Sequence, residues 1–143
     1  TLLGPNANIC GTGARANEAI IYPATSQSDA VFSVKADNVT IKGFTIDGDN
    51  PLISTGWTGT NGADIDVFDG VVMADANNTD YFNGLTVENN VIMNVAYFAV
   101  DIFGWYNYAN PPTTGHLVKC NLITDLGTYN TGSGYDKWGS TYI

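Results

Sequence analysis

The chain has 143 residues, of which 44% are hydrophobic and only 13% charged, whereas about 25% charged residues is usual in a globular domain. Five basic residues stand against 14 acidic ones, and the formal net charge of −9 would repel a nucleic-acid backbone. No stretch approaches the roughly 20 apolar residues of a membrane-spanning helix. We therefore expect one domain over residues 1–143, with no nucleic-acid partner and no membrane span.

Pairs of short predicted strands recur along the chain. The first strand of each pair covers 32–36, 72–76 or 100–104, and the second covers 41–46, 87–92 or 118–123. The three second strands superimpose without gaps: each begins with a β-branched residue, has a charged residue next and ends on Ile. This recurrence indicates a repeat protein rather than a β-sandwich, which is the alternative and predicts hairpins between neighbouring strands.

The first strands alternate between an apolar and a polar side. We expect the inner side to carry Phe32, Val34, Ala36, Val72, Ala74, Ala76, Val100, Ile102 and Gly104. The outer side then carries Ser33, Lys35, Met73, Asp75, Asp101 and Phe103. One pair of strands cannot bury its apolar side alone, so copies should stack about 4.8 Å apart. The interior columns are then predicted to be Ile46, Ile92 and Ile123, and Val34, Ala74 and Ile102.

Two segments, 38–46 and 85–92, resemble the parallel β-helix repeat of the pectate-lyase-like superfamily. In that family an Asn at the strand bend often stacks from rung to rung; Asn90 and Asn121 match this position and Phe44 departs from it. The resemblance implies an all-β, right-handed parallel β-helix of about four to five rungs. The segments 3–7, 13–15 and 18–21 look like the first rungs of bacterial surface-protein β-helices, which implies a bacterial secreted or cell-surface protein. Neither end has an obvious cap, so we expect further segments of a longer chain to continue the solenoid.

Carbohydrate-active members of this family work on the outer face of one strand column, which here offers Lys35, Asp75 and Asp101. The carboxylates of Asp75 and Asp101 should lie roughly 5–8 Å apart, a spacing compatible with acid–base chemistry on a glycoside. A solvated polar column, with Lys35 offsetting Asp75, is the favoured alternative.

The enzyme motifs of this family are incomplete in the chain. Asn78-Thr79-Asp80 and Gly115-His116 match parts of two polygalacturonase motifs, without the paired aspartates and the Arg-Ile-Lys. The segment 100–104 is one residue shorter than the catalytic strand of pectin methylesterases. Pectate lyases need an arginine on the groove, and Arg15 falls in an N-terminal loop.

Two groups of loop residues are candidates for binding. Carboxylates of the kind that hold Ca²⁺ occur at Asp47, Asp49, Asp64, Asp66 and Asp69, so a structural Ca²⁺ is the one cofactor considered; service to tight turns is the alternative. Exposed aromatic rings that could stack on sugars occur at Trp57, Trp105, Tyr106 and Tyr108. Their alternative role is to cover a neighbouring rung.

The two cysteines, Cys10 and Cys120, are expected to lie several rungs apart. Either a disulfide or two small buried apolar residues would account for them.

The incomplete motifs favour a non-catalytic extracellular module, such as a stalk or an adhesin-like protein, whose partners are polysaccharides or other surface molecules. A polysaccharide lyase or glycoside hydrolase of the same fold is the alternative.

Overall fold

The computed structural model describes residues 1–59, 62–73, 82–102 and 113–126. Within these ranges the chain forms β-strands, turns and loops, and no helix. Accordingly, the described residues contain no helix with the length and apolar character that a membrane crossing requires.

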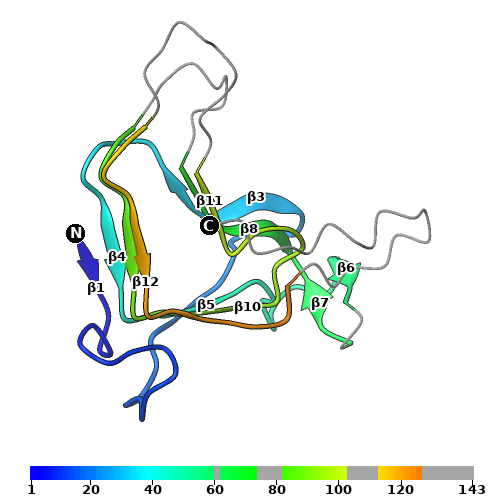
Figure 1. The fold of residues 1–143 in the computed structure, drawn as a ribbon. Helices are drawn as coiled ribbons and strands as arrows, with labels where there is room; N and C mark the ends of the chain where they lie inside the picture. Colours follow the sequence, from blue (N-terminus) through cyan, green and yellow to red (C-terminus); the bar gives the residue numbers. More distant parts are fainter. Residues whose placement is uncertain (60–61, 74–81, 103–112, 127–143) are drawn as a thin grey trace, which may run out of the picture.

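Three parallel sheets make up the scaffold (Figure 1). Sheet A consists of β1 (Leu2–Leu3), β4 (Thr40–Lys42), β9 (Thr86–Glu88) and β12 (Leu117–Lys119). Sheet B consists of β2 (Ile20–Ile21), β5 (Thr45–Asp47), β10 (Val91–Met93) and β13 (Leu122–Ile123). Sheet C consists of β3 (Ser28–Val34), β8 (Val67–Met73) and β11 (Val100–Ile102). The chain passes through sheets A, B and C in this order and then returns to sheet A, so we call one such pass a rung.

All the described strand pairs in these sheets are parallel. The prediction of an all-β chain with parallel strands is therefore confirmed, and the hairpins expected of a β-sandwich do not connect these sheets. An antiparallel pair, β6 (Trp57–Thr58) with β7 (Asp64–Ile65), is inserted between sheets B and C of the second rung.

The interior of sheets A and B follows the predicted columns. Ile92 pairs with Ile46 on one side and with Ile123 on the other, and Ile46 and Ile92 are fully buried. In sheet A, Val87 likewise pairs with Ile41 and Val118. Because the β-branched first residue and the final Ile of each repeat fall in register, both ends of the six-residue pattern point into the core.

Sheet C differs from the prediction by one residue in β8. Val34 pairs with Met73 rather than with Ala74, and Met73 in turn pairs with Ile102; Met73 is buried, so its predicted outer position is wrong. Val72, predicted inside, instead pairs with Ser33 and Asp101.

The offset between β3 and β8 is the same from the Ser28–Val67 pair to the Val34–Met73 pair, so matching Val34 with Ala74 was one residue out along the whole pair. A local irregularity of β8 lies at Gly70 and Val71. Their consecutive N–H groups both donate to the next rung, to Phe98 O (2.9 Å) and Ala99 O (3.0 Å). In a regular strand consecutive N–H groups point to opposite sides, so the alternation is interrupted here. Ala36 was also predicted to face inward, but it is exposed beyond the end of β3. Ala74, Ala76, Phe103 and Gly104 lie outside the described residues.

An asparagine ladder occupies the corner between sheets A and B, as predicted. The Asn121 side-chain oxygen accepts from Asn90 N (2.9 Å) and from the Asn90 amide (3.1 Å), and the Asn121 amide donates to Val87 O (2.8 Å). Asn90 is fully buried, and its side-chain oxygen accepts from Phe44 N (3.0 Å). The ladder therefore ends at Phe44, where the chain has no further Asn to continue it.

Replacing Asn121 by Ala should lower the free energy of unfolding by about 1–3 kcal/mol, because Val87 O and Asn90 N would lose their partners at the corner. Urea denaturation of the two proteins measures the difference. Asn17 is exposed, so Asn17→Ala is a matched control that should change stability by less than about 0.5 kcal/mol. Equal stability of the Asn121 and Asn17 variants would show that the ladder does not stabilise the corner.

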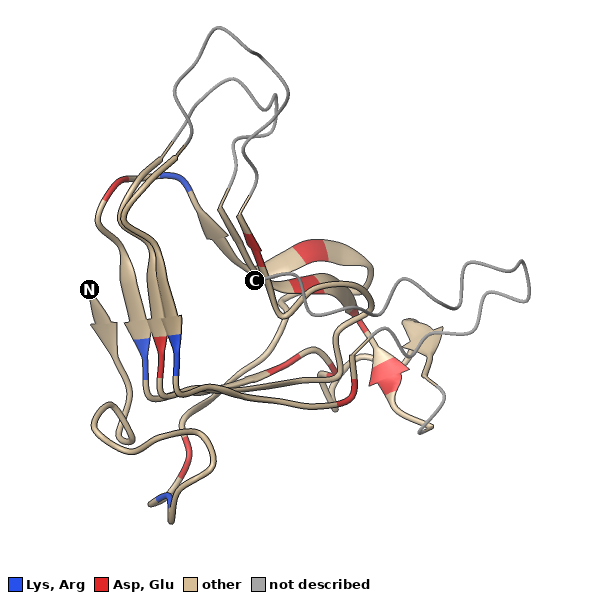
Figure 2. Cartoon of the chain, in the orientation of Figure 1, with Lys and Arg blue, Asp and Glu red and all other residues tan. Residues whose placement is uncertain are grey.

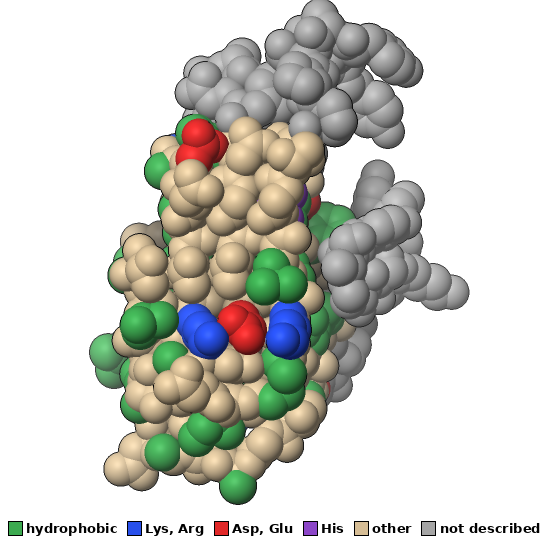
Figure 3. All heavy atoms as spheres, turned by 60° about the vertical axis from the view of Figure 1, so that its left-hand side comes forward, with side chains coloured by type: hydrophobic (Ala, Val, Ile, Leu, Met, Phe, Trp, Pro, Cys, Tyr) green, Lys and Arg blue, Asp and Glu red, His purple; other side chains and the backbone are tan. Residues whose placement is uncertain are grey.

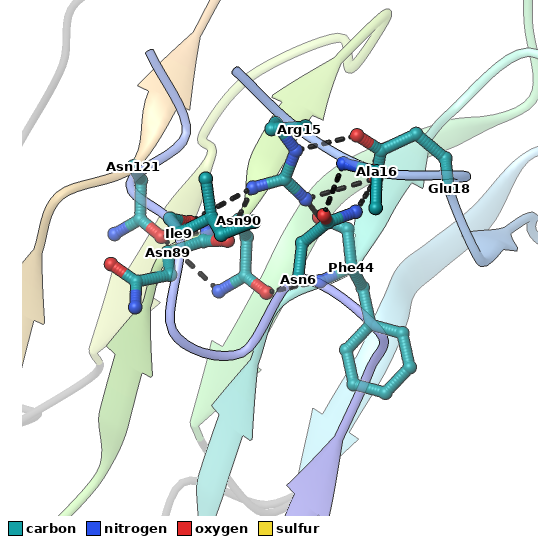
Figure 4. A network of polar contacts seen from close by, with 9 residues as sticks. All are labelled: Asn6, Ile9, Arg15, Ala16, Glu18, Phe44, Asn89, Asn90 and Asn121. Carbon is teal, nitrogen blue, oxygen red and sulfur yellow. Dashed lines mark hydrogen bonds and ion pairs between the residues drawn. The ribbon is translucent and has the colours of Figure 1, made fainter. Parts of the chain in front are cut away.

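The N-terminal segment 5–18 crosses this same corner over three successive rungs (Figure 4). Asn6 N donates to Gly43 O (3.3 Å), Arg15 to Asn89 O (2.7 Å) and Gly11 N to Cys120 O (2.7 Å). The expectation that Cys10 and Cys120 lie several rungs apart is therefore wrong, because the segment that carries Cys10 runs across the rungs instead of along one.

Candidate functional site

Sheet C carries acidic side chains on each of its strands (Figure 2), and two of them, Asp69 on β8 and Asp101 on β11, are partly buried. Asp101 pairs with Val72, which places it three residues further along the sheet than Asp69. Their Cα atoms are thus roughly 10–11 Å apart, from the rise along a strand and the spacing between strands. The Asp69 carboxylate also accepts a hydrogen bond from Phe98 N (2.9 Å).

Both carboxyl groups have raised pKa values. Burial raises the pKa of Asp69 to about 7, and the negative charges of Asp101 and Asp29 add to the effect, against the opposing hydrogen bond from Phe98 N. Burial also raises the pKa of Asp101 to about 6. A pair of carboxyl groups that titrate near neutral pH can exchange protons with a substrate, which ordinary surface aspartates do not do efficiently.

No cation offsets this pair among the described residues. The charged groups that influence the pKa of Asp69 are both carboxylates, and Lys35 is exposed beyond the end of β3. Arg15 is at the opposite corner, where Glu18 and the carbonyls of Asn89 and Phe44 bind its guanidinium. A lyase that stabilises a carbanion beside a uronate needs positive charge or a metal near its base, and the strands of sheet C contain no Lys or Arg.

Two of the three predicted catalytic residues lie in the described part of the chain. Asp101 lies on sheet C as expected, Lys35 lies just after β3, and Asp75 lies outside the described residues. The sequence had placed Asp69 with the calcium ligands, whereas the structure places it on the same sheet as Asp101. Gly70, next to Asp69, was the available signal, since a glycine inside a strand often marks an interruption of the alternation.

Aromatic rings stack beside this sheet. Trp57 packs on Phe68 with ring centroids 4.4 Å apart, and Phe68 stacks on Tyr97 at 5.1 Å with the planes inclined by 9°. The three rings, with Ile65 and Ala96, form a small hydrophobic cluster between the β6–β7 pair and the rungs. Trp57 is therefore half-buried against its own chain, and its role in ligand binding stays a prediction. Trp105, Tyr106 and Tyr108 lie outside the described residues.

Four of the predicted calcium ligands lie between the end of β5 and the start of β8: Asp47 ends β5, Asp64 begins β7, and Asp49 and Asp66 lie in the connecting loops. The Asp47 carboxylate accepts from Asp49 N (3.1 Å), that of Asp49 from Asp64 N (3.3 Å) and that of Asp66 from Asn50 N (3.0 Å). Burial raises the pKa of both Asp49 and Asp66, and the neighbouring carboxylates raise each further. These side chains hold turns together at a cost in charge repulsion.

Asp66 is the most buried carboxylate of this loop cluster. Asp66 is fully buried and one of its oxygens has no hydrogen-bond partner. Yet no group of three or more acidic, His or Cys side chains in the described ranges is arranged to hold a metal ion. Asp69, the fifth predicted ligand, belongs to sheet C. Calcium binding stays a prediction.

If Ca²⁺ binds here, removal of calcium with a chelator should lower the melting temperature by several degrees, because a ligand that binds only the folded state stabilises it. Thermal unfolding in millimolar CaCl₂ and in EGTA makes the comparison, and Asp66→Asn should abolish the difference. The same melting temperature in both solutions would contradict the prediction.

The motif residue His116 lies away from sheet C. Its Nδ1 accepts a hydrogen bond from Leu85 N (3.3 Å) just before β9, and burial lowers its pKa. His116 is thus a neutral residue at the entrance to sheet A, and the structure does not bring it to Asp69 or Asp101.

No family model matches the chain, and no curated protein or solved structure matches it either.

Proposed function

We propose that the chain forms part of a right-handed parallel β-helix in a secreted or cell-surface protein, and that it serves there as a non-catalytic module that can contact glycans. The observation that carries this proposal is the repeated passage through sheets A, B and C, with each rung in parallel register on the previous one. The right hand is supported by the rule that about 98% of crossovers between parallel strands of one sheet are right-handed.

The contacts that the charged side chains make support a scaffold role. On the outer side of sheet A, Glu88 pairs with Lys42 on one rung and Lys119 on the other. They form an alternating row (Figure 3), with a salt bridge of 2.9 Å between Lys42 and Glu88. Arg15 is likewise engaged by Glu18 and by backbone carbonyls. These charges join neighbouring rungs instead of converging on one point, which suits a stalk better than a catalytic centre.

The two outer rungs give a second line of support. On the first described rung Leu2 pairs with the fully buried Ile41 but is itself 46% exposed. On the last described rung Val118 and Ile123 pair with the fully buried Val87 and Ile92 but are only partly buried. Apolar side chains on edge strands are suited to stacking against further rungs. Other segments of a longer chain are the occupants that we propose for these edges.

Incubation of the chain with a panel of neutral and acidic polysaccharides tests the proposal. We expect neither reducing ends nor unsaturated products to accumulate. Binding is measured separately on a glycan array. Turnover that disappears in Asp101→Asn, with the melting temperature unchanged, would overturn the non-catalytic role.

A glycoside hydrolase acting on neutral polysaccharides is the second candidate, favoured by the raised pKa values of Asp69 and Asp101. A carboxyl with a pKa of about 7 can be protonated at neutral pH and donate to a leaving oxygen, while Asp101 would activate water as the base. The carboxyl groups of inverting enzymes are about 6.5–9.5 Å apart, and Cα atoms roughly 10–11 Å apart can place two aspartate carboxyl groups at such a separation.

This candidate requires that Asp69→Asn and Asp101→Asn each reduce turnover by more than about a hundredfold. The rate of the unchanged protein should also fall as the pH rises above the pKa of the acid. Turnover that survives both substitutions would place the chemistry elsewhere.

A further inference from the structure

We propose that Cys10 and Cys120 form a disulfide bond that fastens the N-terminal segment across the corner between sheets A and B. The inference concerns a modification site and stands independently of the proposed function. Cys10 and Cys120 are 110 positions apart in sequence, yet the Cys10 thiol donates to Cys120 O at 3.2 Å.

The backbone around the two residues is closely docked. Gly11 N donates to Cys120 O at 2.7 Å. A Cβ at Gly11 would lie 2.3 Å from Leu122 N and 2.4 Å from Asn90 O, so only a glycine fits beside Cys10. This contact fixes the position of Cys10 against the last described rung, and the bond can form without a large movement of either chain segment.

The backbone of Cys120 supplies an independent reason. Gly43, Asn89 and Cys120 occupy equivalent places at the end of sheet A on three rungs, and all have positive φ angles, of 82°, 59° and 57°. Gly and Asn adopt this left-handed conformation readily, whereas other side chains are strained in it. A cysteine held in a conformation that disfavours it suggests that its thiol has a role.

The chemistry of the thiols is suited to oxidation. The hydrogen bond with the Cys120 side chain is the main cause that lowers the pKa of Cys10, and Thr12 adds to it. The same contact raises the pKa of Cys120. Cys10 is therefore the thiol that ionises first, and both residues are accessible to solvent, as reactive cysteines must be.

The oxidant that we propose is a small-molecule disulfide. The Cys10 thiolate attacks one sulfur of that disulfide, which releases one thiolate and leaves a mixed disulfide on Cys10. The Cys120 thiolate then attacks the sulfur of Cys10 and releases the second thiolate. The protein loses two protons and two electrons, and the small-molecule disulfide is reduced to two thiols.

A soft metal ion is the competing ligand for two neighbouring thiols, but two sulfurs do not complete a zinc site, which normally has four protein ligands. In the described ranges no third metal-binding side chain joins the two cysteines. The geometry therefore favours the disulfide.

Oxidised glutathione is the probe for the test. After incubation, intact mass should show the loss of two hydrogen atoms, thiol titration should find no free thiol, and a proteolytic peptide should join the segments that contain Cys10 and Cys120. The oxidised chain should melt roughly 10 °C above the reduced chain, since the bond closes a long loop in the unfolded state.

Cys120→Asn is the matched variant, because Asn occupies the equivalent place at Asn89 and tolerates the same backbone. It should fold, and its melting temperature should not respond to the oxidant. Two free thiols after oxidation, a glutathione adduct that persists on Cys10, or dimers linked between chains would each overturn the proposal.

Discussion

Replacing Ile92 by Ala should lower the free energy of unfolding by about 2–5 kcal/mol. Ile92 is fully buried and stacks between Ile46 and Ile123 in sheet B. Truncation would leave a cavity between two filled rungs, and the neighbouring isoleucines are held by their own strands and cannot collapse into it. The loss should therefore include both the transfer of the side chain and the unfilled volume.

Urea denaturation of the variant and the unchanged chain measures this effect. The control is Ile20→Ala, which removes the same atoms from the same sheet at a position that is 43% exposed, and it should cost less than about 1 kcal/mol. If the two variants were equally stable, the column of isoleucines would not be the core of the scaffold.

The sequence predicted the stacking of sheets A and B because nothing interrupts the repeat there. The segments 41–46, 87–92 and 118–123 have the same length and end on the same residue type, so a simple superposition gives the register. Sheet C was predicted one residue out of register, because the segment 72–76 has apolar residues at Val72 and Ala74 and also at Met73 between them. Its alternation therefore does not distinguish the two faces of the strand.

The same limit applies to the sites. The sequence grouped Asp69 with the other loop aspartates, because the side of sheet C on which its side chain lies depends on the interruption at Gly70. The approach of Cys10 to Cys120 was not predictable either, because segment 5–18 shares no pattern with the rungs and crosses them. The equivalent places of Gly43, Asn89 and Cys120 do carry a signal: the first two are residue types that favour a left-handed backbone.

Asp69→Asn should stabilise the protein at pH 8 by about 2–4 kcal/mol and have little effect at pH 4. Burial raises the pKa of Asp69 from 3.8 to about 7 in the folded protein, so the folded state binds the proton more tightly than the unfolded state does. The contribution of Asp69 to stability is therefore most favourable below about pH 4, falls as the pH rises and is fully unfavourable above about pH 7.

Asparagine is the suitable replacement because its side-chain oxygen can still accept the hydrogen bond from Phe98 N, while the group no longer ionises. Asp69→Ala removes the acceptor as well, so it should be less stable than Asp69→Asn at both pH values. Denaturant titrations of the three proteins at pH 4 and pH 8 separate the loss of the charge from the loss of the hydrogen-bond acceptor. The contributions of the other acidic groups to stability cancel, because the three proteins are compared at the same pH. If Asp69→Asn were destabilised equally at both pH values, the pKa of Asp69 would not be raised in the folded protein, and neither the buried acid on sheet C nor the hydrolase candidate built on it would stand.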